Sequence, residues 1–247
     1  MHAGQLAFVQ AVRQEFPAWF TDRRVLEIGS LDINGSVRVC FERCDYTGID
    51  VAPGPGVDLV AEGQDYAAPD GSFAVVISCE AMEHNPHWAA TFRNMLRLCA
   101  PGGMVLITCA TSGRPEHGTR RSEPQASPLT VGLGWDWYRN VTAGEFAAAA
   151  DLPGLLDAWC FFRDIAASDL YFLGFRHGVE PAALAPGPNR LRRTLARRNR
   201  TMAALRKAVS LALLGERRYL LLPPLTPASL PLIGRALLRR SGFGRRS

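Results

Sequence analysis

The segment VLEIGSLDING, residues 25–35, constrains the fold of this chain more strongly than any other. Its apolar start with a β-branched residue predicts a buried strand, and Gly29 after it predicts a sharp bend where the backbone can approach a ligand closely. In open α/β sheets, ligands bind beyond the carboxyl ends of the strands. The segment therefore predicts both a class of fold and the edge of the sheet at which a ligand binds.

Further strand-like runs follow the first one at intervals. The expected strands are 24–28, 46–50, 57–60, 73–78, 104–109, 158–163 and 169–175. Apolar residues at helical spacing predict helices over 5–20, 86–99 and 142–150. The last of these opens with Thr142 and Glu145 in the spacing of a capping box. Alternating strands and helices favour a mostly parallel, doubly wound Rossmann-like sheet with helices on both faces, which we expect over residues 1–178.

Three segments depart from this alternation. Residues 111–141 are rich in Gly, Pro, Ser and Thr and predict a long loop, which in a compact domain is usually functional. Residues 179–189 form a Pro-rich stretch that predicts a linker. Residues 190–247 form a basic extension whose pattern is mainly helical, and helical over 190–214. We expect this extension to follow the sheet domain as a separate part.

The charge of the chain is concentrated in the extension. The net charge is +5, but residues 190–247 hold 15 Arg and Lys against the single acid Glu216. This pattern admits peripheral contact with an anionic membrane, a grip on a nucleic-acid backbone, or an arm that binds another copy or a partner. The arginines lack stacking aromatics and the predicted ligand edge is acidic, so nucleic acid is the least favoured partner. The sequence predicts no oligomeric state.

Hydropathy and cysteine usage favour a cytoplasmic protein. No apolar run approaches the roughly 20 residues that span a bilayer, and the first residues lack the basic and apolar regions of a secretory signal. The cysteines have no paired spacing, which favours reduced thiols; they are Cys40, Cys44, Cys79, Cys99, Cys109 and Cys160. Because the His and Cys residues lack the spacing of zinc ligands, we expect no metal site. Peripheral contact with the inner membrane face stays open.

The turn after the first strand separates two classes of adenosine cofactor. Asp50 ends the second strand about 20 residues after Gly29, the spacing at which a carboxylate accepts hydrogen bonds from ribose hydroxyls. A dinucleotide site needs G-x-G-x-x-G for its pyrophosphate. Here Leu31 replaces the second glycine, and the carboxylates of Glu27 and Asp32 would repel a pyrophosphate. A cationic sulfonium cofactor suits these acids better, which disfavours a nicotinamide oxidoreductase.

Over residues 20–177 the chain resembles the class I S-adenosylmethionine-dependent methyltransferases. The resemblance rests on VLEIGS, YTGIDV, FAVVISCEAMEH and LRLCAPGGMVLIT, the last of which is similar to the L-x-P-G-G turn of that family. It implies a seven-stranded sheet and S-adenosylmethionine as the cofactor. It also implies a methionine end near Glu27 and Gly29, with Ser30 as a further cofactor-binding residue of the same turn. Ribose would lie at Asp50, adenine near Val51 and Gln64 or Asp65, and the cofactor's middle against Cys79 and Glu80.

Methyl transfer needs a base only when the acceptor must lose a proton. The candidate catalytic residues are His84, which alternatively serves the start of the following helix, and His117 in the long loop. The same loop holds Arg114, Arg120, Arg121, Trp135, Trp137 and Tyr138. These side chains either bind an anionic or planar acceptor or pack onto the core as a lid.

The resemblance and the site together predict methylation of an oxygen or nitrogen of a small molecule or a glycan precursor. The alternative is a catalytically inactive relative that keeps the fold and acts as a binding or membrane-associated partner protein.

Overall fold

A computed structural model describes residues 3–184 and 187–221. Within these residues seven strands form one sheet: β1 (Arg24–Ile28), β2 (Asp45–Asp50), β3 (Leu59–Val60), β4 (Phe73–Cys79), β5 (Cys99–Ala110), β6 (Leu156–Asp164) and β7 (Asp169–Arg176). Their order is β3-β2-β1-β4-β5-β7-β6. Strands β1 to β5 pair in parallel, whereas β7 is antiparallel to both β5 and β6. The predicted seven-stranded, mostly parallel Rossmann-like sheet is confirmed.

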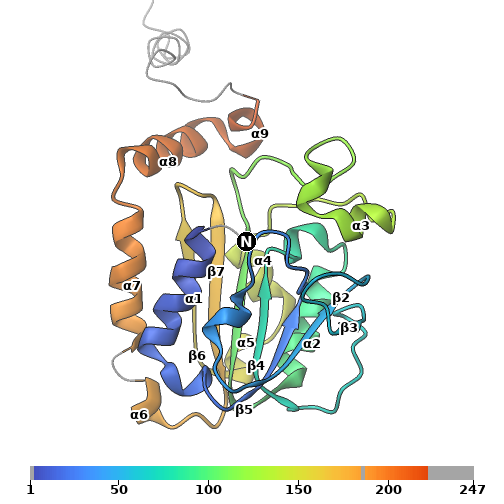
Figure 1. Ribbon diagram of the computed structural model, residues 1–247. Coiled ribbons are helices and arrows are strands. Elements are labelled where there is room, and N and C mark those ends of the chain that lie inside the picture. Colours follow the sequence, from blue (N-terminus) through green and yellow to red (C-terminus); the bar gives the residue numbers. More distant parts are fainter. Residues whose placement is uncertain (1–2, 185–186, 222–247) are drawn as a thin grey trace, which may run out of the picture.

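Helices cover both faces of this sheet (Figure 1). The described α-helices are α1 (Ala3–Glu15), α2 (Trp88–Leu98), α3 (Pro128–Gly132), α4 (Ala143–Ala149), α5 (Leu152–Leu155), α6 (Pro181–Leu184), α7 (Gly187–Arg198), α8 (Met202–Leu214) and α9 (Glu216–Tyr219). Short 3-10 turns are η1 (Pro17–Trp19), η2 (Val37–Cys40), η3 (Met82–His84) and η4 (Pro124–Ala126). None of the helices in the described part of the chain is long and apolar enough to cross a membrane.

Two apolar clusters hold the layers together, one on each side of the sheet. Successive residues of a strand face opposite sides, so Val25 packs with α1 and Leu26 packs with α2 and α4. The central strands are buried on both faces, and therefore their sequences are nearly continuous apolar runs. Helix α4 opens with the predicted capping box, in which Thr142 and Glu145 bond each other's backbone N–H groups.

The leading helix is shorter than the predicted range 5–20. Helix α1 ends at Glu15, and a separate 3-10 turn begins at Pro17. Proline has no backbone N–H and disfavours a helical conformation in the residue before it, here Phe16. The apolar periodicity continues through this break because Phe16, Trp19 and Phe20 still pack on the same core as the helix.

The segments expected to be loop and linker contain helical structure. Residues 111–141 carry η4 and α3, and each of these begins at a proline, where the missing N–H costs nothing. Residues 179–189 contain α6 and the first residues of α7. Helix α7 then runs along α1 on one face of the sheet (Figure 1). The first part of the basic extension is therefore built into the sheet domain.

Side chains of α7 and the following turn anchor the extension. Leu191 and Leu195 belong to the same core cluster as α1. The side chain of Asn199 accepts a hydrogen bond from Ile165 N at 2.8 Å and donates one to Arg163 O at 2.6 Å. These bonds join the extension to the turn between β6 and β7, at the end of the sheet where α3, α8 and α9 lie (Figure 1).

The rest of the described extension crosses this end of the sheet. Lys207 Nζ donates to Ala166 O at 3.1 Å, and a carboxylate oxygen of Glu216 accepts from Gly113 N at 2.8 Å and from Asn140 Nδ2 at 2.6 Å. Helix α8 leaves one apolar row exposed, formed by Met202, Leu205, Val209 and Leu213. The remainder of the predicted extension, 222–247, and its expected membrane contact lie outside the described residues.

Candidate active site

The carboxyl ends of the parallel strands meet at one edge and enclose a cavity of about 320 Å³. Its inner wall includes Gly29 after β1, Asp50 at the end of β2, and Cys79 and Glu80 at the end of β4. Residues between Arg114 and Thr130 form the outer wall. This volume is that of a small-molecule site, located at the edge where α/β sheets bind their ligands.

Gly29 allows the turn after β1 to pass directly against the end of β4. Its φ is +80°, and a Cβ atom at this position would lie 2.4 Å from Cβ of Ala81. The N–H groups of Gly29 and Ser30 both donate to Ile49 O, at 2.9 and 3.1 Å, which fixes the turn to β2. A side chain at Gly29 would therefore both strain the backbone and force β1 and β4 apart at the cavity.

Asp50 presents an oriented carboxylate at the cavity wall. Its Oδ2 accepts from Leu31 N at 3.0 Å, and its Oδ1 accepts from Val51 N at 2.8 Å. Burial raises the pKa of Asp50 although both backbone bonds lower it. Each oxygen keeps a further lone pair, so the carboxylate can also accept hydrogen bonds from ligand hydroxyls.

Glu27 lies behind this wall as a buried acid. Its Oε2 accepts a hydrogen bond from the hydroxyl of Tyr46 at 2.8 Å. Burial is the main cause that raises the pKa of Glu27 to about 7, against the lowering effect of that bond. The negative charge of Glu27 is thus poorly compensated within the described residues, and a cation in the cavity would favour its ionised form.

The end of β4 carries a strained residue. Glu80 has a φ of +57°, a conformation that non-glycine residues adopt rarely and mostly at functional sites. Its N–H donates to Thr108 O at 2.8 Å, and its Oε1 accepts from Thr108 Oγ1 at 3.2 Å. Burial, with the nearby acids Glu83 and Asp169, raises the pKa of Glu80 well above its usual range. Burial also raises the pKa of the Cys79 thiol.

The two candidate catalytic histidines lie together. The rings of His84 and His117 are 5.0 Å apart between centroids and nearly perpendicular, and Tyr138 contacts both. Burial lowers the pKa of His84 to about 3 and also lowers the pKa of His117. Both imidazoles are therefore neutral at pH 7. Because a base of such low pKa accepts protons weakly, His117 fits the role of a general base better than His84 does.

The cavity gathers six of the predicted site residues: Gly29, Asp50, Cys79, Glu80, His84 and His117. The other five lie off its wall: Glu27, Ser30, Val51, Gln64 and Asp65. Ser30 is buried beneath the turn against Gly48. Gln64 accepts a hydrogen bond from Thr91 Oγ1 at 3.4 Å, near the start of α2. The roles predicted for these residues stay predictions.

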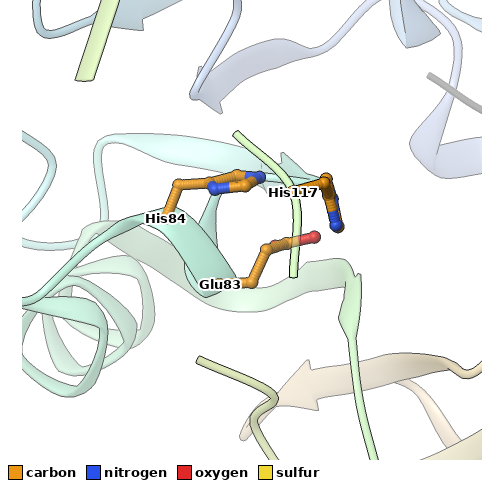
Figure 2. Close-up of side chains that lie close together, drawn as sticks. All are labelled: Glu83, His84 and His117. Carbon is orange, nitrogen blue, oxygen red and sulfur yellow. The ribbon is translucent and has the colours of Figure 1, made fainter. Parts of the chain in front are cut away.

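The structure also places residues whose roles the sequence left open or missed. Arg114 lines the cavity and donates to Ala167 O at 3.0 Å and to Asp169 Oδ1 at 3.4 Å. Arg121 instead pairs with Glu116. Glu83, which was not predicted as a site residue, lies next to His84 and close to His117 (Figure 2). The only signal for Glu83 was its place in EAMEH, directly after a strand that ends at the ligand edge.

The sheet order, with β7 inserted antiparallel between β5 and β6, is that of the class I methyltransferase fold. A family model described as a methyltransferase domain matches residues 2–149, more than half of the chain. The chain therefore belongs to the methyltransferase-domain family. No curated protein matches the sequence significantly.

A solved structure supports this fold. Phosphoethanolamine N-methyltransferase 2 of Haemonchus contortus, in complex with S-adenosyl-L-methionine, matches with a TM-score of 0.51 and 17% identity over 68% of this chain and 52% of that one. The chain thus spans about half the length of that protein. The 1,6-didemethyltoxoflavin-N1-methyltransferase of Burkholderia thailandensis matches with a TM-score of 0.47 and 14% identity, over 69% of this chain and 78% of that one. The N-methyltransferase NodS of Bradyrhizobium japonicum WM9 matches with a TM-score of 0.45 and 14% identity, over 70% and 86%.

Proposed function

We propose that this protein is an S-adenosylmethionine-dependent methyltransferase that acts on an oxygen or nitrogen of a small molecule or a glycan precursor. The observation that carries the proposal is the oriented carboxylate of Asp50, which lies on the same cavity wall as Gly29. A carboxylate at this strand end accepts the ribose hydroxyls of an adenosine cofactor. Membership in the methyltransferase-domain family supports the sulfonium cofactor over a nicotinamide one.

The residues on the cavity fit this cofactor in charge as well as in position. Asp50 would accept the ribose hydroxyls, and Gly29 lines the cavity where the turn after β1 passes against the end of β4. Asp50 and the ionised form of Glu27 place negative charge around the site, which complements a ligand that carries a sulfonium and an ammonium group. A pyrophosphate would meet the same acids, and the N–H groups of Gly29, Ser30 and Leu31 are already bonded to Ile49 O and to Asp50.

S-adenosylmethionine supplies a methyl group on a positively charged sulfur, so catalysis rests mainly on holding the acceptor atom in line with it. The outer wall formed by residues 114–130 performs that positioning and limits the volume left for the acceptor. This small volume supports a small-molecule acceptor. His117 stands on the outer wall as a neutral imidazole, suited to take a proton from a hydroxyl or ammonium acceptor.

Asp50→Ala tests the cofactor site. We expect it to weaken the binding of S-adenosylhomocysteine, measured by calorimetry, by about 10- to 100-fold, because hydrogen bonds to a charged group contribute about 1.5–3 kcal/mol. Asp45→Ala is the matched control, since Asp45 lies at the opposite end of the same strand and pairs with Arg24 at an exposed position. Equal affinities of the two variants would contradict the assignment of Asp50.

A further inference from the structure

We propose that Glu83, His84 and His117 form a binding site for a divalent transition-metal ion on the cavity wall. The site goes beyond the proposed methyl transfer and stands without it. Only its use, which is to hold an oxygen atom of the acceptor, rests on the proposed function. While an ion is bound, His117 would hold the ion and would not take a proton from the acceptor. Figure 2 shows the three side chains converging, two from η3 and one from the long loop.

The distances between the three side chains suit a common ion. One ligand atom from each residue lies within 4.8 Å of those from the other two. Metal bonds from imidazole nitrogen and carboxylate oxygen are about 2.0–2.2 Å long, so ligand atoms on one tetrahedral ion lie about 3.3–3.6 Å apart. Rotations that move each of these atoms by less than about 1 Å would therefore bring all three onto one ion.

Two of the potential ligand atoms are buried and have no hydrogen-bond partner in the described part of the chain. They are Oε2 of Glu83 and Nδ1 of His84, on side chains that are 0% and 3% exposed. A buried polar atom left without a partner costs about 1–3 kcal/mol, so in a native structure such an atom usually has a function. Coordination of a cation would be that function for both atoms.

The surroundings hold each ligand in place. Oε1 of Glu83 accepts from Ala110 N at 3.0 Å, which leaves Oε2 directed elsewhere. Nδ1 of His117 contacts Pro115 O at 3.1 Å, a donor position that leaves its Nε2 free to bind an ion. Gly118 lies so close to the His84 ring that a Cβ atom there would be 2.5 Å from Cε1. The loop therefore packs against His84, and this contact keeps His117 close to His84.

The kind of ligand selects the kind of metal. Two imidazoles and one carboxylate suit Zn²⁺, Co²⁺, Fe²⁺ or Ni²⁺, whereas Mg²⁺ and Ca²⁺ prefer sites made of oxygen atoms. Three protein ligands leave a coordination position for another molecule. Two of the three ligands, His84 and His117, line the cavity, whereas Glu83 is buried beside them, so we expect that position to face the space for the acceptor. An acceptor with a hydroxyl or carboxylate oxygen is the class that such an ion would hold.

The test is a titration of the chelator-treated full chain with Zn²⁺ and Co²⁺, without cofactor. We expect one ion of each to bind per chain, while Mg²⁺ gives no saturable binding under the same conditions. The visible bands of bound Co²⁺ report nitrogen and oxygen ligands, and we expect none of the near-ultraviolet charge-transfer absorption that a cysteine thiolate would give. This readout needs no variant, and it does not depend on whether the protein binds S-adenosylhomocysteine.

The matched variants are His117→Ala and His87→Ala. His87 is exposed and lies three positions after His84, outside the cluster. We expect His117→Ala to weaken Zn²⁺ binding by more than about 100-fold, because losing a residue that only hydrogen-bonds to a metal ligand already lowers metal affinity by about 10- to 100-fold. His87→Ala should bind as the wild type does. Equal Zn²⁺ binding by the two variants, a thiolate band, or no binding by the wild type would overturn the proposal.

Discussion

Replacing Glu27 by Gln is expected to raise the free energy of unfolding by about 3 kcal/mol at pH 8, since each pKa unit corresponds to about 1.4 kcal/mol. Burial raises the pKa of Glu27 to about 7 from a usual value of 4.5. Below the pKa of the unfolded chain the carboxyl is protonated in both states, and the fold keeps its full stability. As the pH rises from there to about 7, only the unfolded chain ionises readily, so the free energy of unfolding falls; above about 7 the loss is constant. Gln carries no charge, and its carbonyl oxygen can still accept the bond from Tyr46.

The measurement is urea unfolding of both proteins at two pH values. At pH 5 the gain should fall below about 1 kcal/mol, because most of the buried carboxyl is protonated there in the wild type. Glu180→Gln, at an exposed position, serves as the control and should show no gain at either pH. Parallel pH profiles for the wild type and Glu27→Gln would contradict a buried, poorly compensated charge.

The same substitution should weaken S-adenosylhomocysteine binding at pH 8 by about tenfold, or about 1.4 kcal/mol, because the ammonium group of that ligand loses an opposing charge. A variant that gains stability and loses ligand affinity is the signature of an acid retained for binding rather than for folding. Unchanged affinity would place Glu27 outside the ligand's electrostatic reach, and would leave its effect on stability unaffected.

Leu191→Ala is expected to lower the free energy of unfolding by about 2–5 kcal/mol, the usual cost of removing a fully buried leucine side chain. Leu191 is 0% exposed and packs in the core that α7 shares with α1. Leu213→Ala is the matched control, because Leu213 lies on α8, is 57% exposed and should change stability by less than about 0.5 kcal/mol.

Urea unfolding of the full-length variants distinguishes an integral helix from an appended one. If Leu191→Ala unfolds at the same urea concentration as Leu213→Ala, then α7 does not contribute to the core. Removal of residues 190–247 should likewise destabilise the whole protein, since it would expose the face of α1 that α7 covers and free the backbone of Gly113 from Glu216.

The sequence predicted the sheet well because its strands have a strong local signal. Buried parallel strands are near-continuous apolar runs bounded by turn residues, so both ends of β1 and β4 were predicted within one residue. The end of β5 was also predicted within one residue, but its start, Cys99, was assigned to the preceding helix. The PGG segment was also informative. A Cβ atom at Gly103 would lie 2.8 Å from the carbonyl oxygens of both Ala74 and Ala100, so only glycine fits where β5 passes β4.

The placement of α7 could not be predicted from local signals. Its apolar residues Leu191 and Leu195 form a narrow row among many arginines, a pattern equally typical of a helix on a membrane surface. The position of α7 depends on another part of the chain. Residues 29–44, between β1 and β2, form only the short turn η2. One face of the sheet is therefore covered by α1 and α7 instead of a helix between these strands.

The cluster of Glu83, His84 and His117 could not be predicted from the sequence for a related reason. His84 and His117 were recognised separately as candidate bases, but the loop that carries His117 is brought to His84 by tertiary contacts such as that of Gly118. Spacing rules for metal ligands detect sites within one motif, and this cluster joins a short helix to a loop over 30 residues further on. Asp50 could be placed at the ligand edge from the sequence because the ends of strands are fixed by the sheet, and its contact with ribose stays a prediction.

The most direct test of the central claim is a pair of calorimetric titrations of the wild-type protein, one with S-adenosylhomocysteine and one with NADH. The acidic cavity wall predicts saturable binding of S-adenosylhomocysteine with a micromolar dissociation constant, equivalent to about −8 kcal/mol, and no saturable binding of NADH. Binding of NADH alone, or of neither compound, would contradict the assignment of this cavity to a methyltransferase cofactor.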